Sequence, residues 1–197
     1  MTVKQFFKSS AFKCILVLTC IALIAGGVLA ILNDVLYVSD EERTQQAIKK
    51  IYGQAVEYQE VTVSEEKAVN EYGTIDKVYK LSDGNYLFKS TGTEGYKGGT
   101  VTLWIVADFE GDTFKGLDKV KVAGNEKQTL MSSFKSSFTD FYTNNDDLLL
   151  EGYYFDKVAS EGNIQNVTSG ATRSSNAFNR AVNCTLYFIR NDMEVAR

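Results

Sequence analysis

Alternating apolar and polar positions indicate β-strands through the middle of the chain. The strand-like stretches are rich in β-branched and aromatic residues and are interrupted by turn signals: Asp83-Gly84 lies in one interruption, and Gly111 lies in another. In the longest stretch, Val101, Leu103 and Ile105 are predicted to face one side, together with Ala107. Neighbouring stretches joined by short turns predict an antiparallel sheet. The expected strands are residues 55–63, 74–81, 86–91, 100–109 and 113–122.

A period of three to four residues predicts helices on either side of these strands. Ser39 and Glu42 have the spacing of a capping box, which predicts a helix over residues 39–52. An aromatic stripe at Phe134, Phe138 and Phe141 predicts a helix that faces the core. The polar residues 144–147 are expected to form a turn, and residues 148–155 a strand or a buried extended segment.

The last helix is predicted from the apolar positions between Phe178 and Ile189, with Ser174 or Ser175 as its cap. Because helices are predicted before and after the strands, the expected fold class is α+β. It consists of an antiparallel sheet flanked by helices, with one N-terminal transmembrane helix.

The N-terminal apolar stretch covers residues 14–32, nineteen residues without a charge. As a helix it would be about 28 Å long, close to the thickness of the hydrocarbon layer of a bilayer. Lys4, Lys8 and Lys13 precede it and acidic residues follow it, so the positive-inside rule predicts a cytoplasmic N-terminus over residues 1–13. A cleaved signal peptide and a lipoprotein modified at Cys20 are the alternatives. The expected layout is a single-pass cell-membrane protein in which residues 33–197 form one extracytoplasmic domain.

Composition excludes several functions. The formal charge is −4 over the whole chain and −7 over residues 33–197, which disfavours a nucleic-acid partner. There is no histidine, so the commonest general base and metal ligand is absent. Cys184 is the single cysteine after the apolar stretch, so no disulfide or iron–sulfur cluster is expected within that domain. We expect no catalytic residues, no metal site, and neither a Rossmann fingerprint nor a P-loop.

The chemistry of the chain is concentrated just before the last predicted helix. Ser169, Gly170, Ala171 and Thr172 are small or hydroxyl-bearing residues that lead into it. Free backbone N–H groups and the helix dipole at such a position favour an anion such as phosphate, and a glycine allows close approach of a ligand. An ordinary capped helix after a glycine turn is the simpler reading of the same residues.

Ser169-Gly170-Ala171-Thr172, with Arg173-Ser174-Ser175-Asn176-Ala177 after it, resembles the S-G-A-T-x-[ST]-S-x-A signature of the FMN-binding domain shared by RnfG and NqrC subunits. The chain is most similar to the RnfG type. In that family the final threonine carries FMN through a phosphoester bond, which a flavin transferase makes from FAD. The resemblance therefore assigns covalent FMN to Thr172. The family often has Asp where this chain has Asn166.

Two further stretches match the same family. Residues 92–99 contain a G-Y-x-G-type loop, which in the family helps to enclose the flavin, although a flexible turn would have the same composition. Residues 125–131 stand where many members have E-T-P-G-L-G, with neither the proline nor the glycines. The cofactor-binding residues that the resemblance implies are Ser169, Gly170, Ala171, Thr172, Arg173, Ser174, Ser175, Gly95, Tyr96, Gly98, Gly99, Gln128, Thr129 and Leu130.

The resemblance implies an electron-transfer subunit of a membrane ion-translocating oxidoreductase of the Rnf type (ferredoxin:NAD) or the Nqr type. Residues 33–91 would be a membrane-proximal helix and strands, and residues 92–197 the FMN-binding region. The implied partners are the integral subunits of that complex and the flavin transferase. The alternatives are a free-standing, membrane-anchored flavoprotein electron carrier and an anchored binding domain without redox function.

Overall fold

The computed structural model describes residues 10–37, 39–131, 134, 136–150, 152, 154–155 and 171–193. The chain divides into two compact units, Met1–Gln46 and Ala47–Arg197. Helix α3 (Asp40–Tyr52) runs across the division. Of the predicted cytoplasmic segment, residues 1–9 lie outside the described part.

The first unit contains helix α2 (Ser10–Leu36), which extends beyond the predicted 14–32 at both ends. Its stretch Phe12–Asn33 is long and apolar enough to cross a membrane. Apolar side chains are exposed all along it, among them Leu23 at 71% and Ile31 at 66%, which distinguishes it from the core helix of a soluble domain. The capping box at the start of α3 is confirmed: Ser39 N–H donates to Glu42 Oε2, and Glu42 N–H donates to Ser39 Oγ, each at 3.2 Å.

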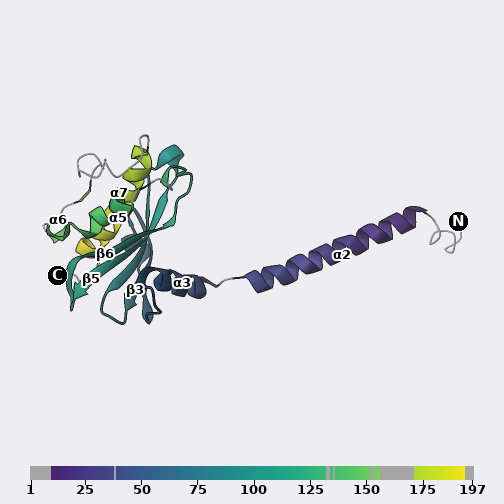
Figure 1. The fold of residues 1–197 in the computed structure, drawn as a ribbon, viewed down its shortest axis with the longest axis horizontal. Helices are drawn as coiled ribbons and strands as arrows, with labels where there is room; N and C mark the ends of the chain where they lie inside the picture. The colour runs from purple at the N-terminus through teal and green to yellow at the C-terminus, as the bar shows by residue number, and fades with distance from the viewer. Residues whose placement is uncertain are drawn as a thin grey trace. The chain divides into compact units, whose positions relative to one another are not determined.

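The second unit is built on an antiparallel sheet in the order β1-β3-β4-β5-β6, with β2 paired to β3 (Figure 1). Both predicted hairpins are confirmed, one between β3 and β4 and the other between β5 and β6. The first strand is shorter than the predicted 55–63. The bounds are β1 (Tyr58–Val61), β2 (Val69–Asn70), β3 (Gly73–Leu81), β4 (Tyr86–Gly92), β5 (Val101–Glu110) and β6 (Thr113–Gly124).

The two faces of the sheet bury alternate residues of the same strands, as period-two patterning requires. On one face, Leu103 and Ile105 belong to the main core with Phe178 of α7 (Thr172–Asn191) and Phe138 of α5 (Ser136–Thr143). On the other face, Leu87 and Val106 pack with Ile48 and Ile51 of α3, together with Tyr79 and Leu81. The predicted side of Val101, Leu103, Ile105 and Ala107 is therefore the face that α7 covers. Figure 1 shows α5 and α7 on this face.

One predicted element is wrong. Residues 146–150 form helix α6 (Asp146–Leu150), where a polar turn and an extended segment were expected. Leu149 is buried against the core while Leu150 is exposed, so this apolar run buries one side only. A short helix α4 (Glu65–Ala68) and a 3-10 turn η1 (Tyr96–Gly98) complete the described elements.

Candidate functional site

Thr172 is the first residue of α7, a helix of 20 residues. Thr172 and Arg173 are exposed, whereas Ala171, Ser174 and Ser175 are buried. The hydroxyl of Thr172 thus stands at the solvent-facing start of a long helix, where the dipole and the first-turn N–H groups favour negative charge. Ser169 and Gly170, the other residues of the predicted motif, lie outside the described part of the chain.

Neither serine caps this helix, which corrects the sequence prediction. The N-cap residue is Ala171, and it makes no side-chain cap hydrogen bond. Ser175 Oγ donates to the Ala171 carbonyl at 3.0 Å, within the first turn. Ser174 Oγ instead points out of the helix and donates to Gln128 Oε1 at 2.7 Å. Because α7 begins at Thr172, Ser174 lies inside its first turn, and its side chain makes a tertiary contact.

Gln128 joins the three predicted stretches. Its side chain is buried, at 2% exposure. Oε1 accepts from Ser174 Oγ and from the N–H of Tyr96 at 2.9 Å, while Nε2 donates to the carbonyls of Glu126 at 2.7 Å and Tyr96 at 3.2 Å. Both acceptor positions and both donor positions of the amide are therefore used. Residues far apart in the sequence meet at this one side chain.

Two of the predicted glycines make room for that amide. A Cβ atom on Gly95 would lie 2.7 Å from Gln128 Nε2, and one on Gly99 would lie 2.6 Å from the same atom. Both distances are shorter than any carbon–nitrogen contact that packing tolerates. At both positions a backbone carbonyl lies closer still, that of Gly99 beside residue 95 and that of Glu126 beside residue 99, so the neighbouring backbone as well as the amide requires glycine there. Gly95 N–H also donates to the Gly99 carbonyl at 2.9 Å, which closes the loop on itself.

Non-glycine residues with left-handed backbone lie in two of these segments, 92–99 and 125–131. In the described part of the chain, the non-glycine residues with positive φ are Glu94, Lys97 and Lys127, at 63°, 53° and 58°. Gly98 is also left-handed, at 68°, and no atom lies within 4 Å of the position its Cβ would take. Left-handed backbone at non-glycine residues costs free energy and concentrates at ligand-binding and active sites. Here it lies in the two segments that Gln128 joins.

The outer side of this loop carries an aromatic ring and charges of both signs, because Glu94 is exposed as well as Lys97. Tyr96 is 42% exposed, and Lys97 Nζ lies 5.3 Å from the centre of its ring. Thr129 and Leu130 are exposed as well, the latter at 39%. The predicted residues therefore divide into a buried connection, through Gln128 and Ser174, and an exposed surface around it.

Arg180 is a residue that the sequence motifs did not indicate. It lies two turns after Thr172 on α7, and its Nε donates to Thr93 Oγ1 at 3.2 Å. Its Nη2 donates to the carbonyl of Glu71 and lies 3.5 Å from Glu94 Oε1. Arg180 thereby holds the start of the 92–99 loop against the same helix that Gln128 reaches. No local pattern surrounds this arginine, so the sequence offers no signal for its role.

Other chemistry in the described residues is sparse. They contain no group of three or more His, Cys, Asp or Glu side chains placed to hold a metal ion. Cys184 is buried in the core, and burial raises the pKa of its thiol to about 12, with a smaller opposing effect from the Asn70 side chain. A thiol that stays protonated at neutral pH is a poor nucleophile and a poor redox group.

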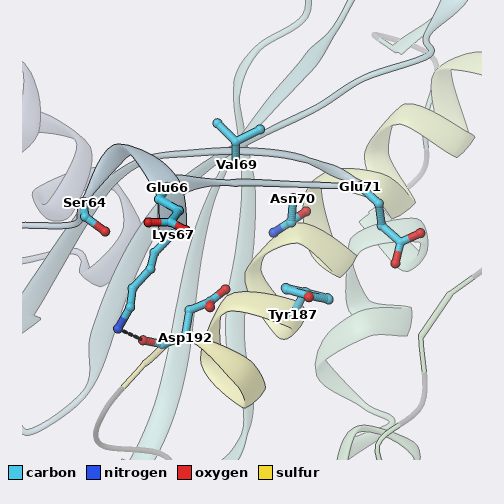
Figure 2. A pocket seen from close by; sticks show the side chains of 8 residues that line it. All are labelled: Ser64, Glu66, Lys67, Val69, Asn70, Glu71, Tyr187 and Asp192. Atoms are coloured by element: carbon cyan, nitrogen blue, oxygen red, sulfur yellow. Dashed lines mark hydrogen bonds between the residues drawn. The ribbon is translucent and has the colours of Figure 1, made fainter.

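Three hollows of about 390–500 Å³ lie elsewhere among the described residues, and the one of about 500 Å³ is lined by residues that include Lys115, Asp118 and Asp146. One of about 450 Å³ opens at the C-terminal end of α7, where Lys67 donates to the Asp192 carbonyl at 3.2 Å (Figure 2). Glu66, Glu71 and Asp192 offset the charge of the lysine there. A neighbouring hollow of about 390 Å³ shares Ser64, Lys67 and Asp192 and is more apolar. None of the three is lined by a predicted site residue that the structure describes, so these hollows are separate from the connected loops at Gln128.

The arrangement brings a helix N-terminus and an aromatic loop together through one buried amide. Thr172 is exposed at a helix N-terminus, and the glycine loop carries the exposed ring of Tyr96; Ser174 and Gln128 connect the helix to the backbone of that loop. No protein-family model and no curated protein matches this sequence. The likeness to the RnfG and NqrC domain therefore rests on the sequence of residues 92–99, 125–131 and 169–177 alone.

Proposed function

We propose that this protein is a membrane-anchored electron-transfer flavoprotein that carries FMN as a phosphoester on Thr172. One observation carries the proposal: Ser174, Gln128 and Tyr96 are hydrogen-bonded in series, two residues from the exposed Thr172 hydroxyl. The three stretches that resemble the FMN-binding family thus lie together in space. An ordinary capped helix would need none of these contacts.

In this proposal each part of the site has a distinct task. Thr172 supplies the ester oxygen, and the start of α7 favours the phosphate charge. The 95–99 loop and Tyr96 provide a surface on which an isoalloxazine ring can pack, while Lys97 and Arg173 add positive charge around it. Bound FMN would accept and donate the electrons, and the protein's role is to hold and orient it. These residues together bind a cofactor and contain no group for hydrolytic chemistry.

The ester would form by transfer of the FMN group from FAD to the hydroxyl of Thr172. The Thr172 oxygen forms a bond to the FMN phosphorus of FAD, the pyrophosphate P–O bond breaks, and AMP leaves. The hydroxyl proton passes to a base of the flavin transferase. Attachment suits a domain outside the cytoplasm, where a dissociated cofactor could not be replaced from the cytoplasmic pool. The lysines before the apolar stretch 14–32 and the acidic residues after it favour that orientation.

The proposed setting is a Rnf-type or Nqr-type ion-translocating complex. In such a complex α2 would pack among the integral subunits, and this chain would pass electrons between two of its partners. A free-standing flavoprotein carrier would have the same site without those subunits. Affinity purification of the full chain from solubilised membranes separates the two, because integral redox subunits accompany it in the first case only.

The deciding experiment is in-gel flavin fluorescence of denatured membranes from cells that also contain a flavin transferase. We expect a fluorescent band for the wild type and none for Thr172→Ala. The matched control is Thr113→Ala, since Thr113 is an exposed threonine at the start of β6 rather than of a helix. Mass spectrometry of the peptide that contains Thr172 should show the added mass of FMN less one water.

A wild-type protein without a band, beside an active transferase that modifies a known substrate, contradicts covalent attachment. A band that persists in Thr172→Ala places the flavin on another residue. If neither covalent nor tightly bound flavin accompanies the purified protein, the anchored domain has a binding role without redox chemistry.

A further inference from the structure

We propose that Gln128 is a positioning residue, which holds the first turn of α7 against the 95–99 loop so that Thr172 is presented for ester formation. This inference rests on the proposed function of Thr172 and concerns a different residue. Gln128 touches neither Thr172 nor any reacting atom in the structure. Its effect would pass through Ser174, two residues further along the same turn.

The hydrogen bonds of Gln128 require an amide. Oε1 faces two donors, Ser174 Oγ and the N–H of Tyr96. Nε2 faces two acceptors, the carbonyls of Glu126 and Tyr96. A glutamate of the same length would turn one oxygen toward those two carbonyls, and a leucine would leave four polar groups without their partner. Because the side chain is buried at 2% exposure, water cannot replace the lost bonds freely.

The surrounding backbone packs closely around this side chain. A Cβ atom at position 95 or 99 would lie within 2.7 Å of Nε2, and nearer still to the carbonyl of Gly99 or of Glu126, so amide and backbone fill this space together. Lys97 and Lys127 adopt left-handed backbone on either side of the contact. A loop that closes on an amide, at the cost of strained residues, is fixed relative to the helix that the amide also binds. Tyr96 and Thr172 are thereby held in one arrangement.

Fixed placement matters for group transfer, because a displacement of about 1 Å at a reacting atom can cost about a hundredfold in rate. The first test therefore measures the initial rate of FMN incorporation into the full chain in detergent, with purified flavin transferase and FAD. We expect Gln128→Leu and Gln128→Glu to lower the rate at least tenfold at pH 8. Gln59→Glu is the control, since Gln59 is exposed on β1.

The pH dependence of the incorporation rate distinguishes a loss of hydrogen bonds at position 128 from a loss of packing. Burial raises the pKa of a carboxyl group, and the protonated form of a glutamate at position 128 could donate to one of the two carbonyls. The rate of Gln128→Glu, divided by the wild-type rate at the same pH, should therefore rise as the pH falls from 8 to 5.5. The same ratio for Gln128→Leu should stay flat. The charges of Glu94, Lys97, Glu126, Lys127 and Arg173 are present in both variants.

Hydrogen exchange gives a readout that needs no flavin. The Tyr96 N–H donates to Gln128 Oε1, so peptides that contain Tyr96 should exchange faster in Gln128→Leu than in the wild type. Ser174→Ala removes only the helix side of the connection, and it should slow FMN incorporation while Tyr96 stays protected. This second variant decides the question if the substitutions at Gln128 prevent folding.

Two failures can be told apart. If the wild type is not modified at all, the proposed function fails, and the positioning role fails with it. If the wild type is modified and Gln128→Leu and Ser174→Ala are modified at the same rate, the positioning role alone is overturned. A flat pH ratio for a slow Gln128→Glu variant would also overturn it, because loss of packing would then explain the effect.

Discussion

The carbonyl oxygen of Ala177 occupies the space in which a Cβ atom on Gly92 would lie. The same Cβ would also overlap the backbone of Ala181, one turn further along α7. Gly92 ends β4, and the helix therefore rests with its backbone directly on the strand. Both alanines are fully buried, so no side chain can move aside. This contact sets how close the first half of α7, and with it Thr172, lies to the sheet.

Gly92→Ala should destabilise the domain, because the added methyl group meets backbone rather than a flexible side chain. We expect a loss of about 3 kcal/mol in the free energy of unfolding, at the upper end for an overpacked core. Urea denaturation of the full chain in detergent, followed by Trp104 fluorescence, measures it. Gly124→Ala is the matched control, since a Cβ there meets only Thr102 at 3.7 Å. Equal stability of the two variants would contradict the close contact.

Gly99→Ala should disturb the candidate site more than Gly98→Ala. A Cβ at position 99 would overlap the Glu126 carbonyl and approach Gln128 Nε2 to 2.6 Å, so the loop must move away from the amide. At position 98 no atom lies within 4 Å, and alanine meets only the cost of a left-handed backbone, about 1–2 kcal/mol. Hydrogen exchange at Tyr96 should therefore rise strongly in Gly99→Ala and little in Gly98→Ala. The reverse order would contradict the fit of the loop around Gln128.

Local patterns predicted the sheet because each strand buries alternate residues. Leu87 and Phe88 are neighbours in the chain and belong to opposite cores, so this part of β4 is continuously apolar, and the Asp83-Gly84 turn before it marked the strand instead. Residues 148–150 were not predictable in this way. A short apolar run suits a strand as well as a helix, and Leu149 is buried in α6 only because tertiary packing places it there.

The sequence predicted the three stretches of the candidate site, but it did not predict that residues from them are in contact. Motif resemblance indicated Tyr96, Gln128 and Ser174 separately. Their hydrogen bonds span 32 and 46 residues of sequence, and no helical or strand period reports a contact at such separations. The same separation explains why Arg180 was missed, since its partner Thr93 lies 87 residues away. Ser174 was assigned to the cap because local chemistry favours that role, but α7 begins at Thr172, so Ser174 lies inside the first turn and its hydroxyl binds Gln128.

Asn183→Leu should lower stability through two backbone groups that lose their partner. Asn183 is buried on α7, accepts from the N–H of Phe155 at 2.8 Å and donates to the carbonyl of the same residue at 2.7 Å. Each buried group left unpaired costs about 1–3 kcal/mol, so we expect a total loss of about 2–5 kcal/mol. Asn191→Leu on the same helix is the control, because Asn191 is exposed and should change stability by about 0.5 kcal/mol or less. Urea denaturation of both variants checks this, and equal losses would contradict a special role for Asn183.

Cys184 should react with thiol reagents only when the domain unfolds. Burial raises the pKa of this thiol to about 12, and the thiolate is the reactive form. In a chain with Cys14→Ser and Cys20→Ser, alkylation by iodoacetamide at pH 8 should be slow and should accelerate across the urea transition. Alkylation without urea at the rate of a free thiol would contradict burial of Cys184.

The raised pKa also makes a prediction about stability at alkaline pH. The folded pKa lies above the unfolded value of 9.0, so the thiol contributes its full stability below pH 9 and loses it as the pH rises toward 12. Lysines and tyrosines titrate in the same range, so the informative quantity is the difference between the wild type and Cys184→Ala. We expect the wild type to be the more stable protein at pH 7 and this difference to shrink progressively above pH 9. A difference that stays constant from pH 7 to pH 11 would mean that the folded and unfolded thiols titrate alike.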